Sequence, residues 1–277
     1  MSREQFYNFT PDEKLFSKIE ECQKLKALID SRKGGSSGVW ETVHQKLLID
    51  WTYNSNAIEG SSLTFGETLF FLQNGLTVEG KPLKDFLDAR NHSEAIGFLY
   101  DVIKDRREIT PGLLKEFNAL LLAGIKFTPA MDASGNRIEK PATPGEYKKL
   151  PNHVLQPDGT IHRYTEPIHV ADEIEELCGK IVFLSEKIHP LIVSALAHYN
   201  FVRIHPFDDG NGRGARILMN LILMKAGYPP VVVKNEKRRL YLESLAKGDR
   251  GNLQPFVAFC IDSCLETMRS IKEELLK

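Results

Sequence analysis

The stretch HPFDDGNGRGARILMN, residues 205–220, limits the possible folds of this chain more than any other. The proline after His205 disfavours helical backbone at that histidine, so a preceding helix ends there. Gly210 and Gly212 permit a tight turn, and an apolar run with helical spacing follows them. The sequence therefore predicts two helices joined by a short, polar, glycine-rich turn.

Most of the remaining chain has the apolar spacing of amphipathic helices. Residues 127–168 differ, because they are rich in Pro, Gly, Asp and Thr and contain few apolar runs. Within them, NHVLQPDGTIHRY predicts a β-hairpin around its PDG turn. We therefore predict a mainly α fold with one small hairpin. Helices are expected at 11–32, 39–56, 65–74, 83–105, 110–123, 169–188, 190–203, 213–226, 236–247 and 252–275.

Composition narrows the class of protein. The chain has 277 residues, 42% of them hydrophobic, which suffices for a large buried core. Its formal net charge of -1 argues against nucleic acid as the main partner. The N-terminus has no apolar signal segment and no apolar run reaches membrane-spanning length, so we expect a cytoplasmic protein that does not enter membranes. The four cysteines show no metal-site spacing and are expected to be packing thiols.

The turn and the helix after it have the composition of a phosphate-binding site. A helix start exposes unpaired N–H groups and carries partial positive charge. Glycines let a ligand approach the backbone closely, and arginines add forked donors. Spacings of three and four place three polar side chains on one helix face: Arg213, Arg216 and Asn220.

A base and two carboxylates lie beside this turn. His205 can accept a proton near neutral pH, and Asp208 or Asp209 with phosphate oxygens could hold Mg²⁺. The combination favours phosphoryl or nucleotidyl transfer onto a hydroxyl. Taken singly, these features are also typical of a structural histidine, an ordinary turn and a solvated helix face. The Walker pattern GxxxxGK[ST] is absent, and no βαβ unit surrounds the turn.

The motif HPFDDGNGRGAR fits the signature HPFx[DE]GNGRxxR at every specified position. The chain thus resembles Fic-domain proteins of the Fido superfamily, over roughly residues 60 to 265. The resemblance implies a Fic-fold helical bundle with a β-hairpin flap beside the active site, and transfer of AMP from ATP to a protein hydroxyl. It implies that His205 is the general base, that Asp209 is the Mg²⁺ ligand and that Phe207 fixes the loop. Nucleotide-binding roles fall on Gly210, Asn211, Gly212, Arg213 and Arg216, and in the nucleoside-proximal part on Asn220, Tyr241 and Asp249.

A second stretch, SNAIEG at residues 55–60, resembles the pattern [ST]xxxE[GN] of class II members, which carry their own inhibitory helix. In that class the glutamate pairs with the second motif arginine, so the resemblance implies that Glu59 pairs with Arg216, with Ser55 beginning the motif. A carboxylate there would occupy the place of the γ-phosphate. We accordingly divide the chain into an N-terminal helical region, residues 1–60, and a catalytic domain with C-terminal helices, residues 61–277.

The predicted hairpin resembles the flap of the same family, which pairs with an extended segment of the target by β-augmentation. Main-chain pairing of this kind would align a target hydroxyl with His205. The flap residues expected to bind the target are Asn152, His153, Val154, Leu155, Thr160, Ile161 and His162.

Several functions share these residues. The first is a self-inhibited adenylyltransferase that uses Mg²⁺ and ATP and acts on Ser, Thr or Tyr of a target protein. Self-modification and a homodimer are further expectations for such an enzyme. The second is removal of AMP from a modified protein, or transfer of another nucleotide, at the same site. The third is a non-enzymatic adaptor or nucleic-acid-binding module, which the near-neutral charge and the complete motif disfavour.

Overall fold

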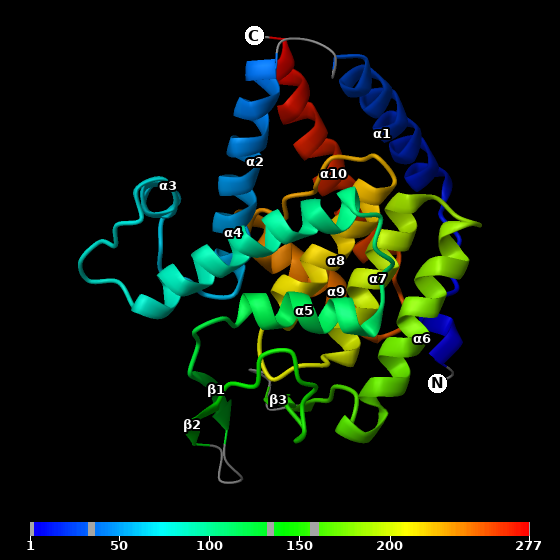
Figure 1. The fold of residues 1–277 in the computed structure, drawn as a ribbon. Helices are drawn as coiled ribbons and strands as arrows, with labels where there is room; N and C mark the ends of the chain where they lie inside the picture. The colour runs from blue at the N-terminus through cyan, green and yellow to red at the C-terminus, as the bar shows by residue number, and fades with distance from the viewer. Residues whose placement is uncertain (1–2, 33–36, 132–135, 156–160, 277) are drawn as a thin grey trace.

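The computed structural model describes residues 3–32, 37–131, 136–155 and 161–276. Helices dominate these residues, as predicted, and two short hairpins project from one end (Figure 1). The elements are η1 (Arg3–Phe6), α1 (Glu13–Arg32), α2 (Ser37–Ile58), α3 (Phe65–Asn74), α4 (Leu83–Lys104), α5 (Pro111–Leu121), β1 (Phe127–Met131), β2 (Arg137–Pro141), β3 (Val154–Leu155), β4 (Ile161–His162), α6 (Pro167–Ser185), α7 (Pro190–Ile204), α8 (Asn211–Lys225), η2 (Asn235–Lys237), α9 (Arg238–Asp249) and α10 (Gln254–Leu275).

Helices α7 and α8 form the centre of the bundle. Proline at the first position of α7 and the His189 side chain, which accepts from the Leu191 N–H, start that helix. Helix α8 packs against α7, α4, α5 and α2, so apolar and polar side chains on several of its sides are buried. The turn between α7 and α8 is therefore held inside a rigid frame.

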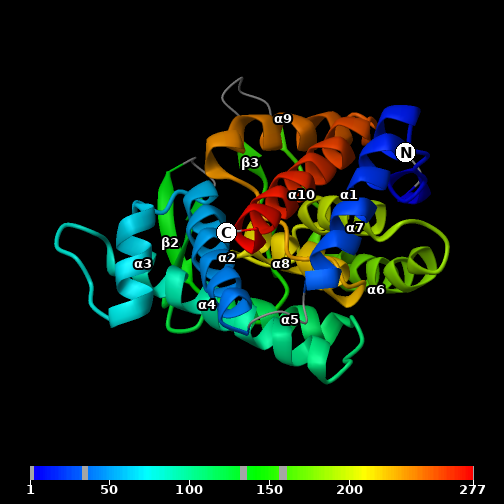
Figure 2. The ribbon, with the colours of Figure 1, turned by 90° about the horizontal axis from the view of Figure 1, so that it is seen from above.

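The first two long helices share one hydrophobic core with the last. Leu15, Cys22 and Val43 pack in the same cluster as Met219 of α8 and Met268 of α10. Seen from above, α1 runs beside α10, and the two helices are in contact (Figure 2). The packing of α1 and α2 thus places the predicted inhibitory motif, residues 55–60, against the helical bundle. The division of the chain at residue 60 stays a prediction.

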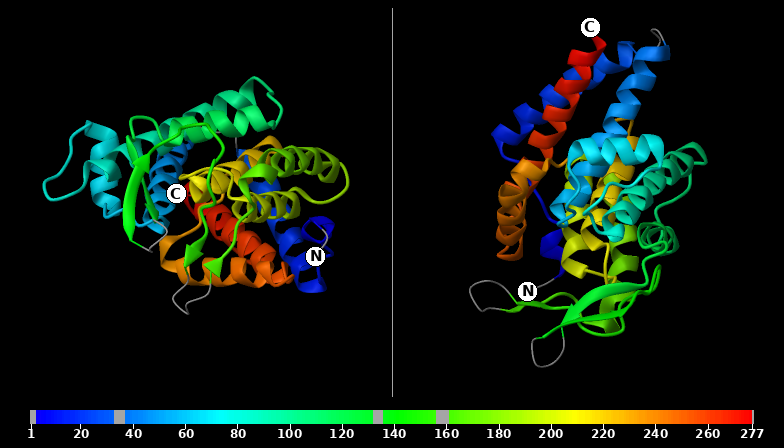
Figure 3. Two further views of the ribbon diagram at one scale, coloured as in Figure 1. Left: turned by 90° about the horizontal axis from the view of Figure 1, so that it is seen from below. Right: turned by 90° about the vertical axis from the view of Figure 1, so that its left-hand side faces the viewer.

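One of the two hairpins was not predicted from the sequence. Strands β3 and β4 pair antiparallel, with Val154 opposite His162, inside the predicted flap. Strands β1 and β2 also pair antiparallel, with Phe127 opposite Pro141. This second hairpin escaped prediction because prolines within its strands weaken the strand signal. Both hairpins lie at the end of the bundle opposite the C-terminus (Figure 3).

The four cysteines are free and buried, in agreement with the predicted packing role. In the part of the chain that the structure describes, no helix combines the length and the apolar character that a membrane span requires.

Candidate active site

His205 closes α7 in a left-handed conformation. Its φ and ψ are 51° and 61°, and its N–H donates to the Phe201 carbonyl at 2.9 Å. Residues other than glycine adopt this conformation uncommonly, at active sites among other places. The reversal turns the chain out of α7 and directly into the motif loop, where buried Phe207 anchors the backbone as expected.

The surroundings of His205 keep its imidazole neutral. The ring of Tyr164, two residues beyond β4, stacks on it with centroids 3.8 Å apart and planes at 19°. Burial and then the positive charge of Lys148 lower the pKa of His205 to about 3, against the opposing effect of a hydrogen bond that the imidazole donates to the Val202 backbone. At neutral pH the imidazole is therefore unprotonated, which is the state that a general base requires.

The start of α8 has the backbone features that were predicted for an anion cradle. Gly210 has φ 80° and stands at the N-cap of α8, where it has no side chain to bond the first helical N–H groups. The first N–H groups of a helix have no carbonyl of their own helix to bond, so they point free at a potential anion. The Asn118 amide on α5 donates to the Asp209 carbonyl at 2.9 Å and holds the loop from behind.

The side chain of Asn211 has a different role from the expected phosphate contact. It accepts from the Phe207 N–H at 2.9 Å and donates to the Phe207 carbonyl at 2.8 Å. The side chain is buried, and its amide oxygen and amide nitrogen both bond the loop backbone. Asn211 thus fixes the shape of the loop, and only its backbone N–H remains for the cradle.

Arg216 is buried and bonds Ser55 and Glu59, the two residues singled out in the predicted inhibitory motif. Its Nη2 lies 2.7 Å from Glu59 Oε1, and its Nε donates to Ser55 Oγ at 2.9 Å. The Ser55 carbonyl accepts from Nη2 at 2.8 Å. The expected pair of Glu59 and Arg216 is therefore present, with Ser55 orienting the guanidinium.

Glu59 also lies over the cradle itself. A Cβ atom added to Gly212 would collide with Glu59 Oε1 and lie 3.3 Å from Arg216 Nη1. Glycine at position 212 thus makes room for a negatively charged oxygen above the first turn of α8. In this structure that oxygen belongs to a carboxylate, in a place suited to a phosphate.

Arg213 was expected to contact phosphate, but the structure pairs it with Asp88 of α4. Its Nη1 lies 2.5 Å from Asp88 Oδ1, and its side chain is 2% exposed. One pattern in the sequence of α4 indicates such a partner. Asp85, Asp88 and His92 recur at spacings of three and four and are all buried, so α4 carries a polar face where an apolar one is usual. Arg213 thus adds positive charge behind the cradle.

Asp209 fits the chemistry of a single-carboxylate Mg²⁺ ligand. Its side chain is 27% exposed, and Oδ1 accepts from the Gly210 N–H at 2.6 Å. Within the described residues no three His, Cys, Asp or Glu side chains gather to hold a metal, so most ligands would have to be phosphate oxygens and water. Asp208 is held by Lys140 of β2 at 2.5 Å and by Thr143 at 3.0 Å, in line with its place at the variable motif position.

The residues expected near the nucleoside occupy different environments. Asn220 is fully buried and bonds the Val231 backbone through its Nδ2 and Oδ1, which gives it a structural role in place of the expected nucleotide contact. Tyr241 is also buried, with its hydroxyl 3.1 Å from His198 Nε2, and so contributes to the core behind the site. Asp249 is 32% exposed and accepts from the Tyr199 hydroxyl at 2.9 Å.

The flap residues divide into a root and a paired part. Asn152 donates to the Phe207 carbonyl at 2.9 Å, so it anchors the flap to the motif loop. His153 Nδ1 accepts from the Tyr164 N–H at 3.3 Å and closes the base of the hairpin. Further out, Val154 and Ile161 are exposed, and His162 approaches Asp249. Leu155 is described by its backbone only, and Thr160 lies outside the described residues.

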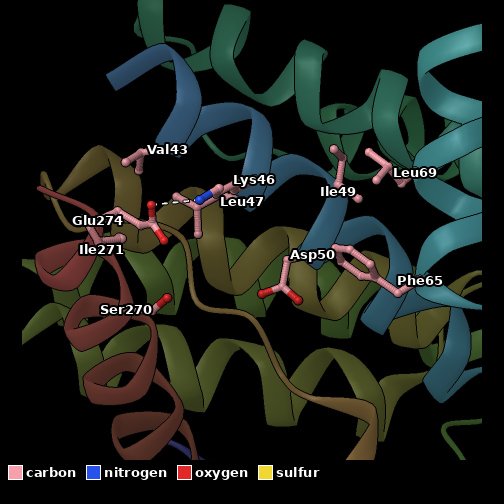
Figure 4. A pocket seen from close by; sticks show the side chains of 10 residues that line it. All are labelled: Val43, Lys46, Leu47, Ile49, Asp50, Phe65, Leu69, Ser270, Ile271 and Glu274. Carbon is pink, nitrogen blue, oxygen red and sulfur yellow. Dashed lines mark hydrogen bonds and ion pairs between the residues drawn. The ribbon is translucent and has the colours of Figure 1, made fainter. Parts of the chain in front are cut away.

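A separate cavity of about 360 Å³ lies between α2, α3 and α10 (Figure 4). Apolar side chains, including Val43 and Phe65, line it, and the ion pair of Lys46 with Glu274 spans 2.8 Å beside it. None of the residues that line this cavity belongs to the motif. The candidate active site is therefore identified from the chemistry of its residues and not from cavity volume.

Comparison with known proteins agrees with this geometry. Residues 108–223 match the sequence model of the Fic/DOC family. The protein adenylyltransferase Fic of Aedes aegypti is 29% identical over 266 residues, which are 93% of this chain and 47% of the insect protein. The chain therefore spans about half the length of this curated relative.

Two solved structures share the fold. A Fic domain containing signaling protein from Bacteroides thetaiotaomicron is 27% identical, with a TM-score of 0.81 over 92% of this chain and 97% of the other. Fic-1 from C. elegans is 25% identical, with a TM-score of 0.76 over 92% of this chain and 72% of the other. The complete motif, the helical frame and the flap thus accompany a Fic/DOC-family domain at residues 108–223.

Proposed function

We propose that this chain is a protein adenylyltransferase that transfers AMP from Mg-ATP to a Ser, Thr or Tyr hydroxyl of a target protein and is inhibited by its own Glu59. The name of the Aedes aegypti relative supports the activity. The observation that carries the proposal is the Glu59 carboxylate on Arg216, above Gly212 of the cradle.

The chemistry follows from the positions of the side chains. The target hydroxyl oxygen forms a bond to the α-phosphorus, the bond from that phosphorus to the bridging oxygen breaks, and pyrophosphate leaves. Neutral His205 accepts the hydroxyl proton. The first turn of α8 and Arg216 hold the phosphates, with the γ-phosphate on Arg216. Asp209 would hold Mg²⁺, which supplies positive charge to the phosphate oxygens.

Inhibition is a competition for one guanidinium. The γ-phosphate and the Glu59 carboxylate both require Nη2 of Arg216, which Glu59 now occupies at 2.7 Å. ATP that binds while the ion pair persists must place its phosphates elsewhere, with the α-phosphorus out of line for attack. The reaction is thereby suppressed without removal of any residue that performs it.

The flap supplies a surface for the target. Val154 and Ile161 are 47% and 55% exposed on adjacent strands, and the short hairpin has open edges for main-chain pairing. Tyr164 links the end of this hairpin to His205. A target segment paired with the flap would therefore bring its hydroxyl toward the base.

The test uses two forms of labelled ATP with Mg²⁺. Label on the α-phosphate should appear on protein, including the enzyme itself, and label on the γ-phosphate should not. Glu59→Gly should increase the α-label, and adding His205→Ala should remove it. Transfer of the γ-label without the α-label would show a kinase, and α-labelling that survives His205→Ala would exclude the proposed base.

AMP removal is a second candidate, because the Glu59 side chain is 41% exposed beside the cradle and could also orient a water. An AMP-modified protein that loses AMP with wild type but not with Glu59→Gly would favour removal. Mass spectrometry of lysate proteins treated with Glu59→Gly and each nucleoside triphosphate would identify the donor. Absence of nucleotide binding by Glu59→Gly in calorimetry would favour the non-enzymatic alternative.

A further inference from the structure

Lys148 is a buried lysine beside the candidate base. It is 2% exposed, and burial lowers the pKa of its ammonium to about 8. Among the described residues, its Nζ donates to oxygens that carry no formal charge, Asn152 Oδ1 at 2.8 Å and the Ile204 carbonyl at 3.4 Å. A buried ammonium is costly unless it is compensated. The charges of Glu166, Asp208 and Glu173 offset the effect of burial only in part, so the place of Lys148 requires an explanation.

The contacts of Lys148 bracket His205. Its Nζ bonds the carbonyl of Ile204, directly before the histidine, and its backbone N–H donates to the carbonyl of Pro206, directly after it, at 2.9 Å. His205 itself has φ 51°, a conformation that its neighbours must maintain. One residue thus fixes the peptide groups on both sides of the base.

The same ammonium reaches the flap. Asn152, its partner at the flap root, also donates to the Phe207 carbonyl in the motif loop. The Tyr164 ring, which stacks on His205, has its centroid 5.8 Å from Lys148 Nζ. Lys148 therefore lies where the flap root, the motif loop and the ring covering the base meet.

We propose that Lys148 is a positioning residue of the transfer reaction, one that fixes His205 relative to the flap so that a hydroxyl presented by the flap meets the imidazole. The inference rests on the proposed function and deepens it. Its charge also acts on His205: the groups that lower the pKa of this imidazole electrostatically are Lys148 and, to a lesser extent, His162 of β4. Tyr164 faces the same imidazole as a stacked, uncharged ring.

The test compares three variants in the Glu59→Gly protein. Lys148→Met keeps an unbranched side chain, one atom shorter, but removes its charge and donors, and Lys148→Arg keeps both. Lys149→Met is the matched control, because the side chain of the adjacent Lys149 is 78% exposed and pairs with Glu146.

We expect Lys148→Met to lower kcat for α-label transfer by about 10- to 100-fold, the range for a displaced general base, while KM for ATP stays unchanged. Lys148→Arg should recover most of the loss, and Lys149→Met should have no effect. In NMR titrations, Lys148→Met should raise the pKa of His205, because a nearby positive charge is removed.

Unchanged kcat in Lys148→Met would overturn the proposal. So would equal losses of kcat and ATP affinity in both Lys148 variants with an unshifted His205 titration, since that pattern indicates a merely structural lysine. If Glu59→Gly transfers no label at all, the proposed function fails instead. The His205 titration, which needs no turnover, then still decides whether Lys148 controls the imidazole.

Discussion

Replacing Glu59 by glycine isolates the effect of a single ion pair. Glu59 follows the last residue of α2, Ile58, so glycine there does not interrupt the helix. Arg216 keeps its bonds to the Ser55 hydroxyl and carbonyl, so the guanidinium should stay in place when its carboxylate partner is removed. The variant therefore exposes a preorganised γ-phosphate site.

The size of the effect follows from the environment of the pair. A hydrogen bond to a charged group contributes about 1.5–3 kcal/mol. Arg216 is buried, but the Glu59 side chain is 41% exposed, so solvent screens part of the interaction. Discounting for that exposure gives about 1–2 kcal/mol. Removal of the competitor should then raise labelling about 5- to 30-fold.

Initial rates of transfer of α-labelled AMP at fixed Mg-ATP would measure this ratio. Glu59→Gln should also increase labelling, by less than glycine, since it removes the charge but leaves a side chain over the cradle. Glu79→Gly is the matched control, because Glu79 is exposed and also precedes a glycine of positive φ, Gly80, in a turn.

Two results would refute the reasoning. An unchanged rate in Glu59→Gly would mean that the ion pair does not limit the productive binding of ATP. A comparable increase in Glu79→Gly would mean that any loosened turn near α3 activates the enzyme, independently of Arg216.

Three further predictions concern the frame around the site. Arg238→Ala should raise wild-type labelling a few-fold by releasing the C-terminus of α2, because the Nε of Arg238 donates to the last carbonyl of that helix at 2.7 Å. The control is Arg239→Ala, because the Arg239 side chain is 92% exposed. Asp88→Asn should lower the free energy of unfolding in urea by about 1.5–3 kcal/mol, because it removes the nearer of the two carboxylates on buried Arg213 and leaves Asp209 at 3.5 Å. Unaltered stability would contradict this. Because the pKa of His205 is lowered to about 3, labelling by Glu59→Gly should not fall between about pH 8 and pH 5, whereas an acid limb near pH 6.5 would indicate a solvated imidazole.

The residues proposed to perform the chemistry could be grouped from the sequence because they are local in it. His205, the glycine turn and Arg216 lie within twelve positions, and the rules for helix ends and helix faces place them together. Glu59 lies 157 residues from Arg216, and periodicity alone gives no reason to pair them. That contact was expected only from the resemblance to a known motif.

The residues that hold the chemistry in place could not be predicted. Asn118 and Lys148 read as an ordinary helix residue and an ordinary loop residue, yet both bond the motif loop across long sequence separations. Asn211 and Asn220 have the right spacing for ligand contacts, but their amides satisfy buried backbone groups instead. Sequence spacing shows which side chains lie on the same face of a helix. It does not show which buried backbone groups those side chains will bond.

These supports also connect the inhibitory helix to the rest of the bundle. Asp50 of α2 bonds Lys234 at 2.5 Å, and Asn54 accepts from the N–H of Asn235 at 2.8 Å, so the segment before α9 holds α2 along its second half. Glu59 can compete with a phosphate only while α2 keeps this position. In the proposed mechanism, the strength of inhibition would therefore depend on contacts that never touch the nucleotide. Asp50 also lines the cavity between α2, α3 and α10, so part of that control would lie on a surface open to solvent.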